Sequence, residues 1–100
     1  MIGSPLVGAG VLIVNEQRFD GAQYRIEVHR TGKSHLIARG VLRPPQAAIG
    51  AATEAFNLGH ALLQLASGHI VEIVPSRFAL SEGVRSLEFT VNGPVPGFGP

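Results

Sequence analysis

The sequence predicts an α+β domain of two layers, in which an antiparallel sheet of four or five strands packs on one long helix. Three observations predict it. Residues 23–30 alternate between polar and apolar side chains, as a half-buried strand does. Residues 45–66 place apolar side chains at spacings of three, four and seven, which is typical of a core-facing helix. Glycines and prolines separate these segments into the order β-β-β-α-β-β.

Two strands are expected before residue 31. Residues 7–14 are apolar or glycine throughout, which predicts a strand that is covered on both faces. Asp20-Gly21 predicts a tight turn, because both residues tolerate a positive φ angle. The strand predicted after this turn directs three side chains to one face: Tyr24, Ile26 and Val28.

A short turn at residues 31–34 predicts that the next strand, His35–Leu42, pairs antiparallel with the strand before it. The middle of this third strand contains Ala38 and Gly40, which are small enough to let a helix backbone approach closely. Pro44-Pro45 ends the strand, and a proline is well tolerated in the first turn of a helix.

The helix is expected over Pro45–Ala66. It ends before Ser67-Gly68, where glycine supplies a left-handed cap. Gly50 and Gly59 inside this stretch each cost about 1 kcal/mol relative to alanine, so we expect close packing at both positions.

Two further strands are expected at residues 69–74, closed by Pro75, and at residues 85–92, with a loop over 75–83 between them. The second of these strands alternates cleanly between apolar and polar side chains. The expected core consists of Val11, Ile13, Tyr24, Ile26, Val28, Leu36, Leu42, Ile49, Phe56, Leu63, Val71, Ile73, Leu87, Phe89 and Val91.

One domain is expected over residues 1–92, followed at 93–100 by an extended tail rich in Pro and Gly. We expect Val95 and Phe98 in this tail to reach across and dock on a neighbouring copy. The chain has no cysteine, which excludes a disulfide framework, a thiolate nucleophile and a Cys-ligated metal site.

Charge and hydropathy narrow the class of partner. The formal net charge of +1 provides no strong field for nucleic acid or an anionic membrane. The apolar run at residues 5–14 is shorter than the about 20 residues that span a bilayer. We therefore expect a soluble, cytoplasmic protein without a membrane partner and without a cofactor.

The expected helix carries a polar stripe with almost no charge, although the exposed face of a helix is normally rich in Lys, Glu and Arg. Only 15% of the whole chain is charged, against about 25% in typical domains. Such a surface indicates that a partner covers it, and a second copy of the chain is the simplest partner. We expect a non-enzymatic, homodimeric binding module whose interface or ligand face draws on Thr53, Asn57, His60, Gln64, Ile37 and Val41.

One alternative is a small enzyme or small-ligand binder with a pocket near Glu54 and His60. These residues are six positions apart, which separates them around a helix, and no nucleophile motif accompanies them. His29 and His35 flank the same short turn, but two imidazoles without a third ligand predict no metal site.

The other alternative is a weak binder of nucleic acid or another anion through Arg25, Arg39 and Arg43, which share the sheet face away from the helix. Glutamates interrupt this stripe, so cross-strand Arg–Glu pairing is expected there instead. No exposed aromatic ladder is predicted, and nucleic acid is not the expected partner.

Overall fold

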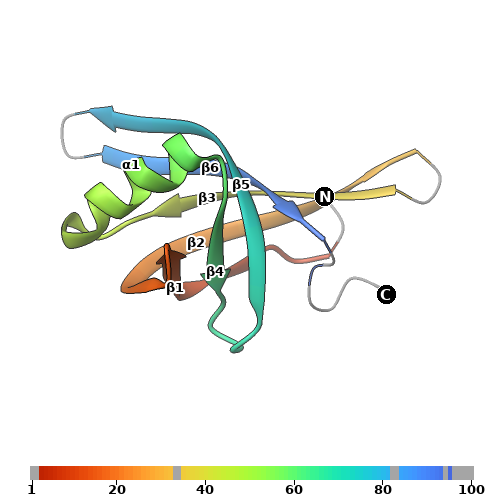
Figure 1. Cartoon of the computed structure of the whole chain (residues 1–100). Coiled ribbons are helices and arrows are strands. Elements are labelled where there is room, and N and C mark those ends of the chain that lie inside the picture. Colours follow the sequence, from red (N-terminus) through yellow and green to blue (C-terminus); the bar gives the residue numbers. More distant parts are fainter. Residues whose placement is uncertain (1–2, 33–34, 82–83, 94, 96–100) are drawn as a thin grey trace.

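In the computed structural model, which describes residues 3–32, 35–81, 84–93 and 95, six antiparallel strands of the described chain close into a barrel (Figure 1). The strands are β1 Leu6–Val14, β2 Gln17–Thr31, β3 His35–Arg43, β4 Ala61–Gln64, β5 Ile70–Ser81 and β6 Val84–Asn92. Their order around the barrel is β1-β2-β3-β6-β5-β4, and β4 returns to β1. The expected two-layer α+β fold is therefore wrong.

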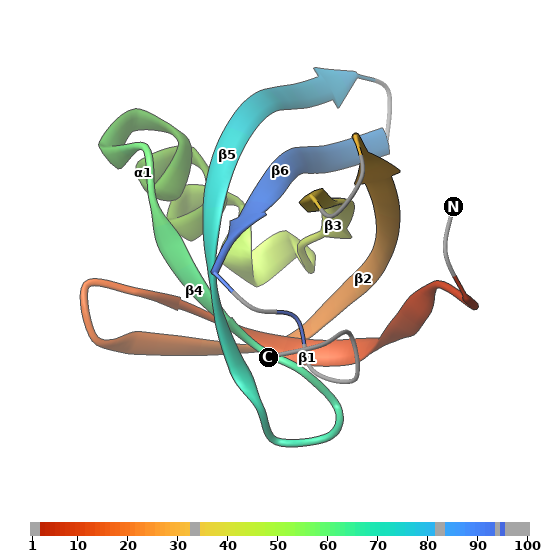
Figure 2. The ribbon, with the colours of Figure 1, turned by 90° about the vertical axis from the view of Figure 1, so that its right-hand side faces the viewer.

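The barrel consists of two three-stranded meanders, β1–β3 and β4–β6, that meet along two seams (Figure 2). At one seam Arg39–Leu42 of β3 pairs with Leu87–Thr90 of β6. At the other seam Val11–Ile13 of β1 pairs with Leu62–Gln64 of β4. Both seams join segments that are far apart in the sequence, so no local pattern reveals them.

The long helix expected over Pro45–Ala66 is also wrong. A 3₁₀ turn at Gln46–Ala48 leads into α1, which spans only Ile49–Leu58. Gly59 ends α1 with a left-handed φ angle of 83°. Ala61, Leu63 and Leu65 after it are buried at every second position, which is the period of a strand. The spacing of these residues also matches the apolar stripe of a helix, but closure of the barrel requires a strand here.

Two predicted turns differ in the structure. The β1–β2 hairpin turns at Asn15 and Glu16, whose φ angles are 50° and 68°. Gly21, with a φ angle of 82°, is instead an extra residue inside β2, opposite the register shift between Gly10 and Val11. The strand expected to close at Pro75 continues to Ser81, with a second register shift just after the proline.

The barrel interior holds most of the expected core: Tyr24, Ile26, Val28, Leu42, Leu63, Val71, Ile73, Leu87, Phe89 and Val91 are buried. In β1 the opposite face is inside, because Leu12 and Val14 are buried where Val11 and Ile13 were expected. Val7 is 64% exposed, so β1 is not covered on both faces. Leu36 and Phe56 are exposed, and Ile49 is half-buried.

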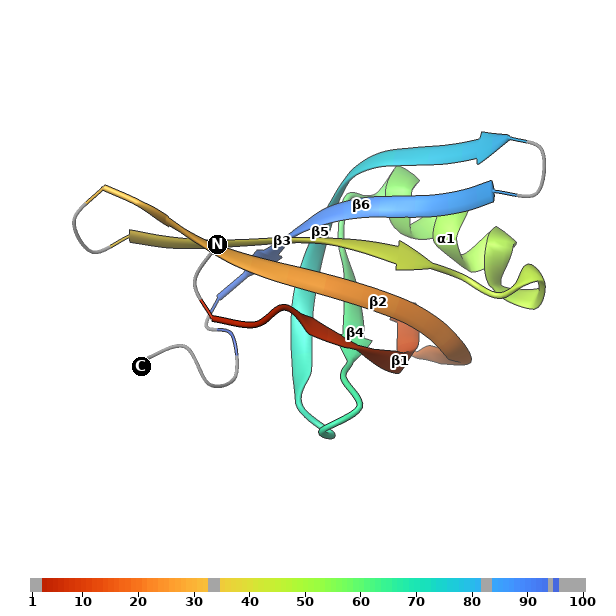
Figure 3. The ribbon, with the colours of Figure 1, turned by 180° about the vertical axis from the view of Figure 1, so that it is seen from behind.

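α1 lies at one end of the barrel, and the last residues of β2, paired with the first residues of β3, project from the other (Figures 1 and 3). The helix buries only alanines, Ala51, Ala52 and Ala55, and it contacts β5, β1 and β6. It therefore acts as a thin cover and not as a second layer. No helix in the described ranges is long and apolar enough to cross a bilayer.

Three glycines were expected to allow close packing, Gly40 against a helix and Gly50 and Gly59 within one, and the structure places them differently. A Cβ atom at Gly40 would lie 2.5 Å from Phe89 Cζ, so this glycine makes room for an interior ring. A Cβ atom at Gly50 would meet nothing within 4 Å, so close packing is absent there. Gly59 is the left-handed cap of α1 and has equally open surroundings.

Tyr24 packs against the first half of β1. A Cβ atom at Gly8 would lie 2.9 Å from Tyr24 Oη, so the ring needs a glycine there. The hydroxyl oxygen accepts a 2.9 Å hydrogen bond from the backbone N–H of Ala66.

Val95, expected to dock on a neighbouring copy, is buried in the core of its own chain, whereas Phe98 lies outside the described residues.

Candidate functional site

The outer face of β1, β2 and β3 carries three arginines, Arg25, Arg39 and Arg43, among exposed apolar side chains. Because successive side chains of a strand point to opposite faces, the odd-numbered residues of β2 and β3 point outward here. Arg25 lies opposite Val41, Gln23 opposite Arg43, and Glu27 opposite Arg39. Arg25, Arg39 and Arg43 therefore share the outer face of the barrel, and anion binding by them stays a prediction.

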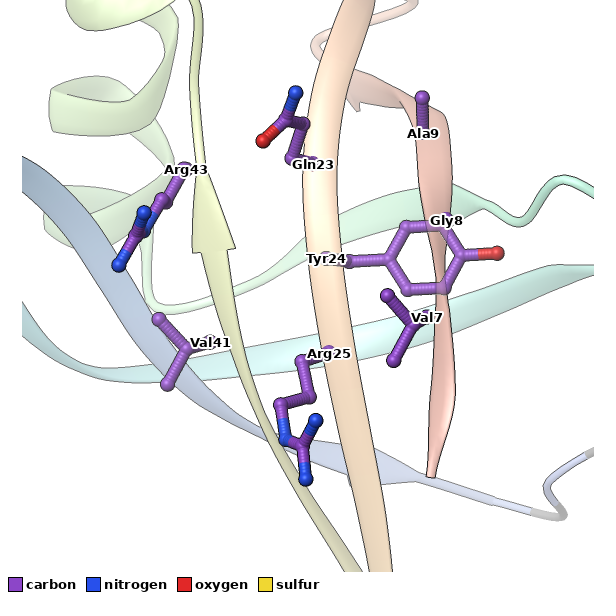
Figure 4. Close-up of a pocket in the computed structure, with 8 residues that line it drawn as sticks. All are labelled: Val7, Gly8, Ala9, Gln23, Tyr24, Arg25, Val41 and Arg43. Carbon is purple, nitrogen blue, oxygen red and sulfur yellow. The ribbon is translucent and has the colours of Figure 1, made fainter. Parts of the chain in front are cut away.

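Two neighbouring hollows lie on this outer face. The first has a volume of about 500 Å³, and Figure 4 shows its lining from β1, β2 and β3. The second, of about 470 Å³, lies between β2, β3 and β6 and includes Arg39, Glu88 and Thr90. Both hollows are lined by Arg25 and Val41. We call the surface formed by Val7, Ala9, Gln23, Arg25, Arg39, Val41 and Arg43 the β3 trough.

The β3 trough also exposes apolar side chains between its arginines. Val7 and Val41 are 64% and 38% exposed, and Ala9 beside Val7 is exposed as well. Val7 lies opposite Arg25, which in turn lies opposite Val41, so the two valines flank this arginine across three strands. The trough therefore combines exposed apolar surface with guanidinium groups.

Contacts with Glu27 and Glu88 neutralise part of the charge of the basic side chains on and around this face. Arg25 Nε donates to Glu27 Oε2 at 3.1 Å, and His29 Nε2 lies 3.4 Å from the other carboxylate oxygen. The hydrogen bond from Arg25 is the main reason why the pKa of Glu27 lies below its usual value. Arg77 lies 3.8 Å from Glu88 at the outer side of β6.

Arg39 and Arg43 form no ion pair with any carboxylate in the described part of the chain. Glu27 is the residue opposite Arg39, but its carboxylate is already engaged by Arg25 and His29. The cross-strand pairing expected for these arginines is therefore wrong within the described residues, because Arg25 pairs along its own strand. A cross-strand pair forms instead between Arg77 and Glu88, outside the predicted stripe. Two guanidinium groups remain available on the β3 trough.

The polar stripe predicted for the long helix is divided among three elements. Thr53 and Asn57 are exposed on α1, whereas His60 lies in the connection to β4. Gln64 lies on β4, where its side-chain oxygen accepts a hydrogen bond from Arg18. Thr53 satisfies part of its polarity locally, because its hydroxyl donates to the Ile49 carbonyl at 3.0 Å. The stripe is not one continuous helix face.

Glu54 and His60 do not converge on the hollows of the β3 trough. Glu54 accepts a hydrogen bond from the Asn15 amide, and both Glu54 and His60 are exposed. His29 lies opposite Ile37 and not opposite His35. Within the described ranges, no group of three His, Asp or Glu side chains is arranged to hold a metal ion.

Sequence reasoning missed the contribution of β1 to this face. Val7 and Ala9 reach the trough because β1 pairs with β2 with Val7 opposite Arg25 and Ala9 opposite Gln23, a register that the uniformly apolar pattern of β1 does not reveal. The continuous apolar run around Val7 gives no sign that this side chain is exposed.

No protein-family model, curated protein or solved structure matches this chain.

Proposed function

We propose that this protein is a small, non-enzymatic binding module that holds an anionic partner on the β3 trough. The observation that carries the proposal is the position of Arg39 and Arg43 on either side of exposed Val41 on one strand. Neither arginine has an ion-pair partner among the described residues. A guanidinium group offers a planar fork of donors that matches a carboxylate or phosphate.

The expected affinity is modest and sensitive to salt. Exposed ion pairs contribute only about 0.2–1 kcal/mol each, because water and ions screen them. The apolar surface of Val7 and Val41 adds a contribution that salt does not weaken. A partner therefore needs both negative charge and some apolar surface to use the whole trough.

Fluorescence anisotropy with labelled poly-L-glutamate tests this function. We expect binding at ~0.05 M salt that weakens strongly at ~0.5 M salt. Replacing both Arg39 and Arg43 with glutamine is expected to weaken it by about 2- to 30-fold, the range for the loss of two exposed ion pairs. The matched control is a double change of Arg18 and Arg30 to glutamine, which removes the same charge outside the β3 trough.

Two outcomes would contradict the proposal. If both double variants lose the same affinity, only the net charge matters and the trough is not a site. If the parent protein does not bind poly-L-glutamate at low salt, no anionic partner is recognised there. Circular dichroism checks that each variant remains folded, which we expect because Arg39 and Arg43 are exposed.

Self-association is a second proposal, supported by a different surface. Phe56 and Leu58 of α1 are 41% and 46% exposed, beside the uncharged side chains of Thr53 and Asn57. Exposed apolar side chains of this size favour burial against another surface. A two-fold dimer through α1 leaves the β3 trough open for its partner.

A further inference from the structure

We infer that the partner of the β3 trough is an extended acidic peptide, with two carboxylates four residues apart and an apolar side chain midway between them. This inference rests on the proposed function and specifies the partner. It is carried by the arrangement of Arg39, Val41 and Arg43 along the outer face of β3, together with the two hollows beside them.

The spacing on β3 selects an extended chain. Arg39, Val41 and Arg43 occupy alternate positions of the strand and so share its outer face. A strand rises about 3.3 Å per residue, which places the Cα atoms of the two arginines about 13 Å apart. A peptide in the same extended conformation repeats at the same interval. Its first, third and fifth side chains therefore meet Arg39, Val41 and Arg43, in either direction.

The two hollows fit this arrangement because each contains one of the available arginines. Arg43 lies in the first hollow, with Val7 and Ala9 beside it. Arg39 lies in the second, whose lining also includes Glu27 and Glu88, two carboxylates that Arg25, His29 and Arg77 already engage. Val41 lines both, so an apolar side chain over Val41 is flanked by a carboxylate on each side. The pattern of the peptide is acidic, any, apolar, any, acidic.

Single-stranded nucleic acid fits the β3 trough less well. Proteins that bind it generally stack bases on exposed aromatic side chains. The aromatic residues that line the two hollows, Tyr24 and Phe89, are both buried in the barrel. The described lining of the two hollows thus offers guanidinium groups, aliphatic side chains and polar side chains but no exposed aromatic ring, which suits a peptide better than a stacked base.

A second copy of the chain also fits poorly on this face. If two copies met face to face around Val41, Arg39 and Arg43 of one copy would lie against the same two arginines of the other. Each arginine would meet either its own equivalent or the other arginine of the pair. Either arrangement places like charges together, which disfavours the contact. Charge complementarity therefore favours an acidic partner over the chain itself.

Isothermal titration with two capped peptides of identical composition tests the register. The matched peptide has the order Glu-Thr-Val-Thr-Glu, and the shifted peptide has the order Glu-Thr-Val-Glu-Thr. In an extended chain the second glutamate of the shifted peptide points away from the trough. We expect the matched peptide to bind about two- to fivefold more tightly, which is the preference that one exposed ion pair gives, and we expect this preference to disappear when Arg39 and Arg43 are both glutamine.

A charge swap tests the contact independently of any loss of folding. Arg43→Glu is expected to weaken binding of the matched peptide. One of the two peptides Lys-Thr-Val-Thr-Glu and Glu-Thr-Val-Thr-Lys is expected to restore it, because its lysine then lies over Glu at this position. Restoration by one peptide alone also gives the direction of the bound chain. Restoration by neither overturns the inference.

The failures of the two proposals are distinguishable. Equal binding of matched and shifted peptides, lost in the Arg39 and Arg43 double variant, overturns the inference and leaves the proposed function standing. Tighter binding of a single-stranded thymidine oligonucleotide than of the matched peptide overturns the peptide class. Failure of poly-L-glutamate, the oligonucleotide and both peptides to bind overturns both proposals together.

Discussion

Gly40 lies beneath the ring of Phe89, where the barrel has no space for a side chain. A Cβ atom there would lie 2.8 Å from both Phe89 Cε1 and the carbonyl oxygen of Arg25. The ring is buried and the carbonyl belongs to the neighbouring strand, so neither yields easily. We expect Gly40→Ala to lower the free energy of unfolding by about 1–3 kcal/mol, as overpacking does.

Urea denaturation measures this loss, and Gly50→Ala is the control. A Cβ atom at Gly50 meets nothing within 4 Å, and the residue lies in α1. Alanine is therefore expected to raise the free energy of unfolding by about 0.5–1 kcal/mol at this position. An unchanged stability of Gly40→Ala would contradict the interior packing described above.

Glu27 has a pKa below its usual value, first because Arg25 donates a hydrogen bond to its carboxylate. A folded-state pKa below the unfolded value means that the stabilisation is present above the unfolded pKa and is lost as the pH falls through the folded pKa. The contribution to stability is small because the pair is exposed.

Arg25→Ala is expected to raise the pKa of Glu27 toward its usual value. A carbon-detected NMR titration of the Glu27 side chain measures it directly. Arg77→Ala is the matched control, since Arg77 pairs with Glu88 and not with Glu27. A Glu27 titration that is identical in the parent and in Arg25→Ala would show that the hydrogen bond does not form in solution.

At the scale of elements, α1 covers one end of the barrel with alanines alone. Its three buried side chains are Ala51, Ala52 and Ala55, so the helix adds little apolar area to the core. Phe56, expected in the core, is 41% exposed. The interior is filled by side chains of the strands instead, with Phe89 among the largest of them.

Truncating the two phenylalanines separates these roles. Phe56→Ala is expected to lower the free energy of unfolding by only about 1 kcal/mol, because much of the side chain is exposed. Phe89→Ala is expected to cost about 3–5 kcal/mol, the range for a buried aromatic ring. Thermal melting followed by circular dichroism compares them. Equal losses would mean that Phe56 is buried and that α1 packs in a different orientation.

At the scale of the whole molecule, two of the surfaces that expose apolar side chains differ in charge. The outer strand face exposes Val7 and Val41 with the arginines of the β3 trough, and α1 exposes Phe56 and Leu58 with no charge except Glu54. The arginines make the first surface suited to an anionic partner. The second surface carries no comparable repulsion against its own copy.

We expect light scattering at micromolar concentration to give twice the chain mass of 10.5 kDa. Asn57→Arg is expected to split the dimer, because it places like charges across a two-fold interface at α1. Val41→Glu is expected to leave the dimer intact. A mass near 10.5 kDa that does not rise with concentration would rule out self-association, and dissociation by Val41→Glu alone would place the interface on the strands.

The sequence by itself determined which faces of several strands lie inside. Tyr24, Ile26 and Val28 are buried as predicted, and Leu87, Phe89 and Val91 are buried in the same way. The reason is that side chains alternate strictly along a strand. When polar and apolar residues alternate as well, only the apolar face can be buried. The same periodicity placed Arg25, Arg39 and Arg43 together on the outer face of the sheet.

Only the tertiary structure decided how the strands close. The pattern of residues 61–65 fits both a helical stripe and a strand, and pairing with β1 and β5 selects the strand. The same closure ends α1 at Gly59 and pairs β4 with the half of β1 in which Leu12 lies inside in place of Val11. These outcomes depend on contacts between distant segments, whose register and seams are not encoded in any local spacing.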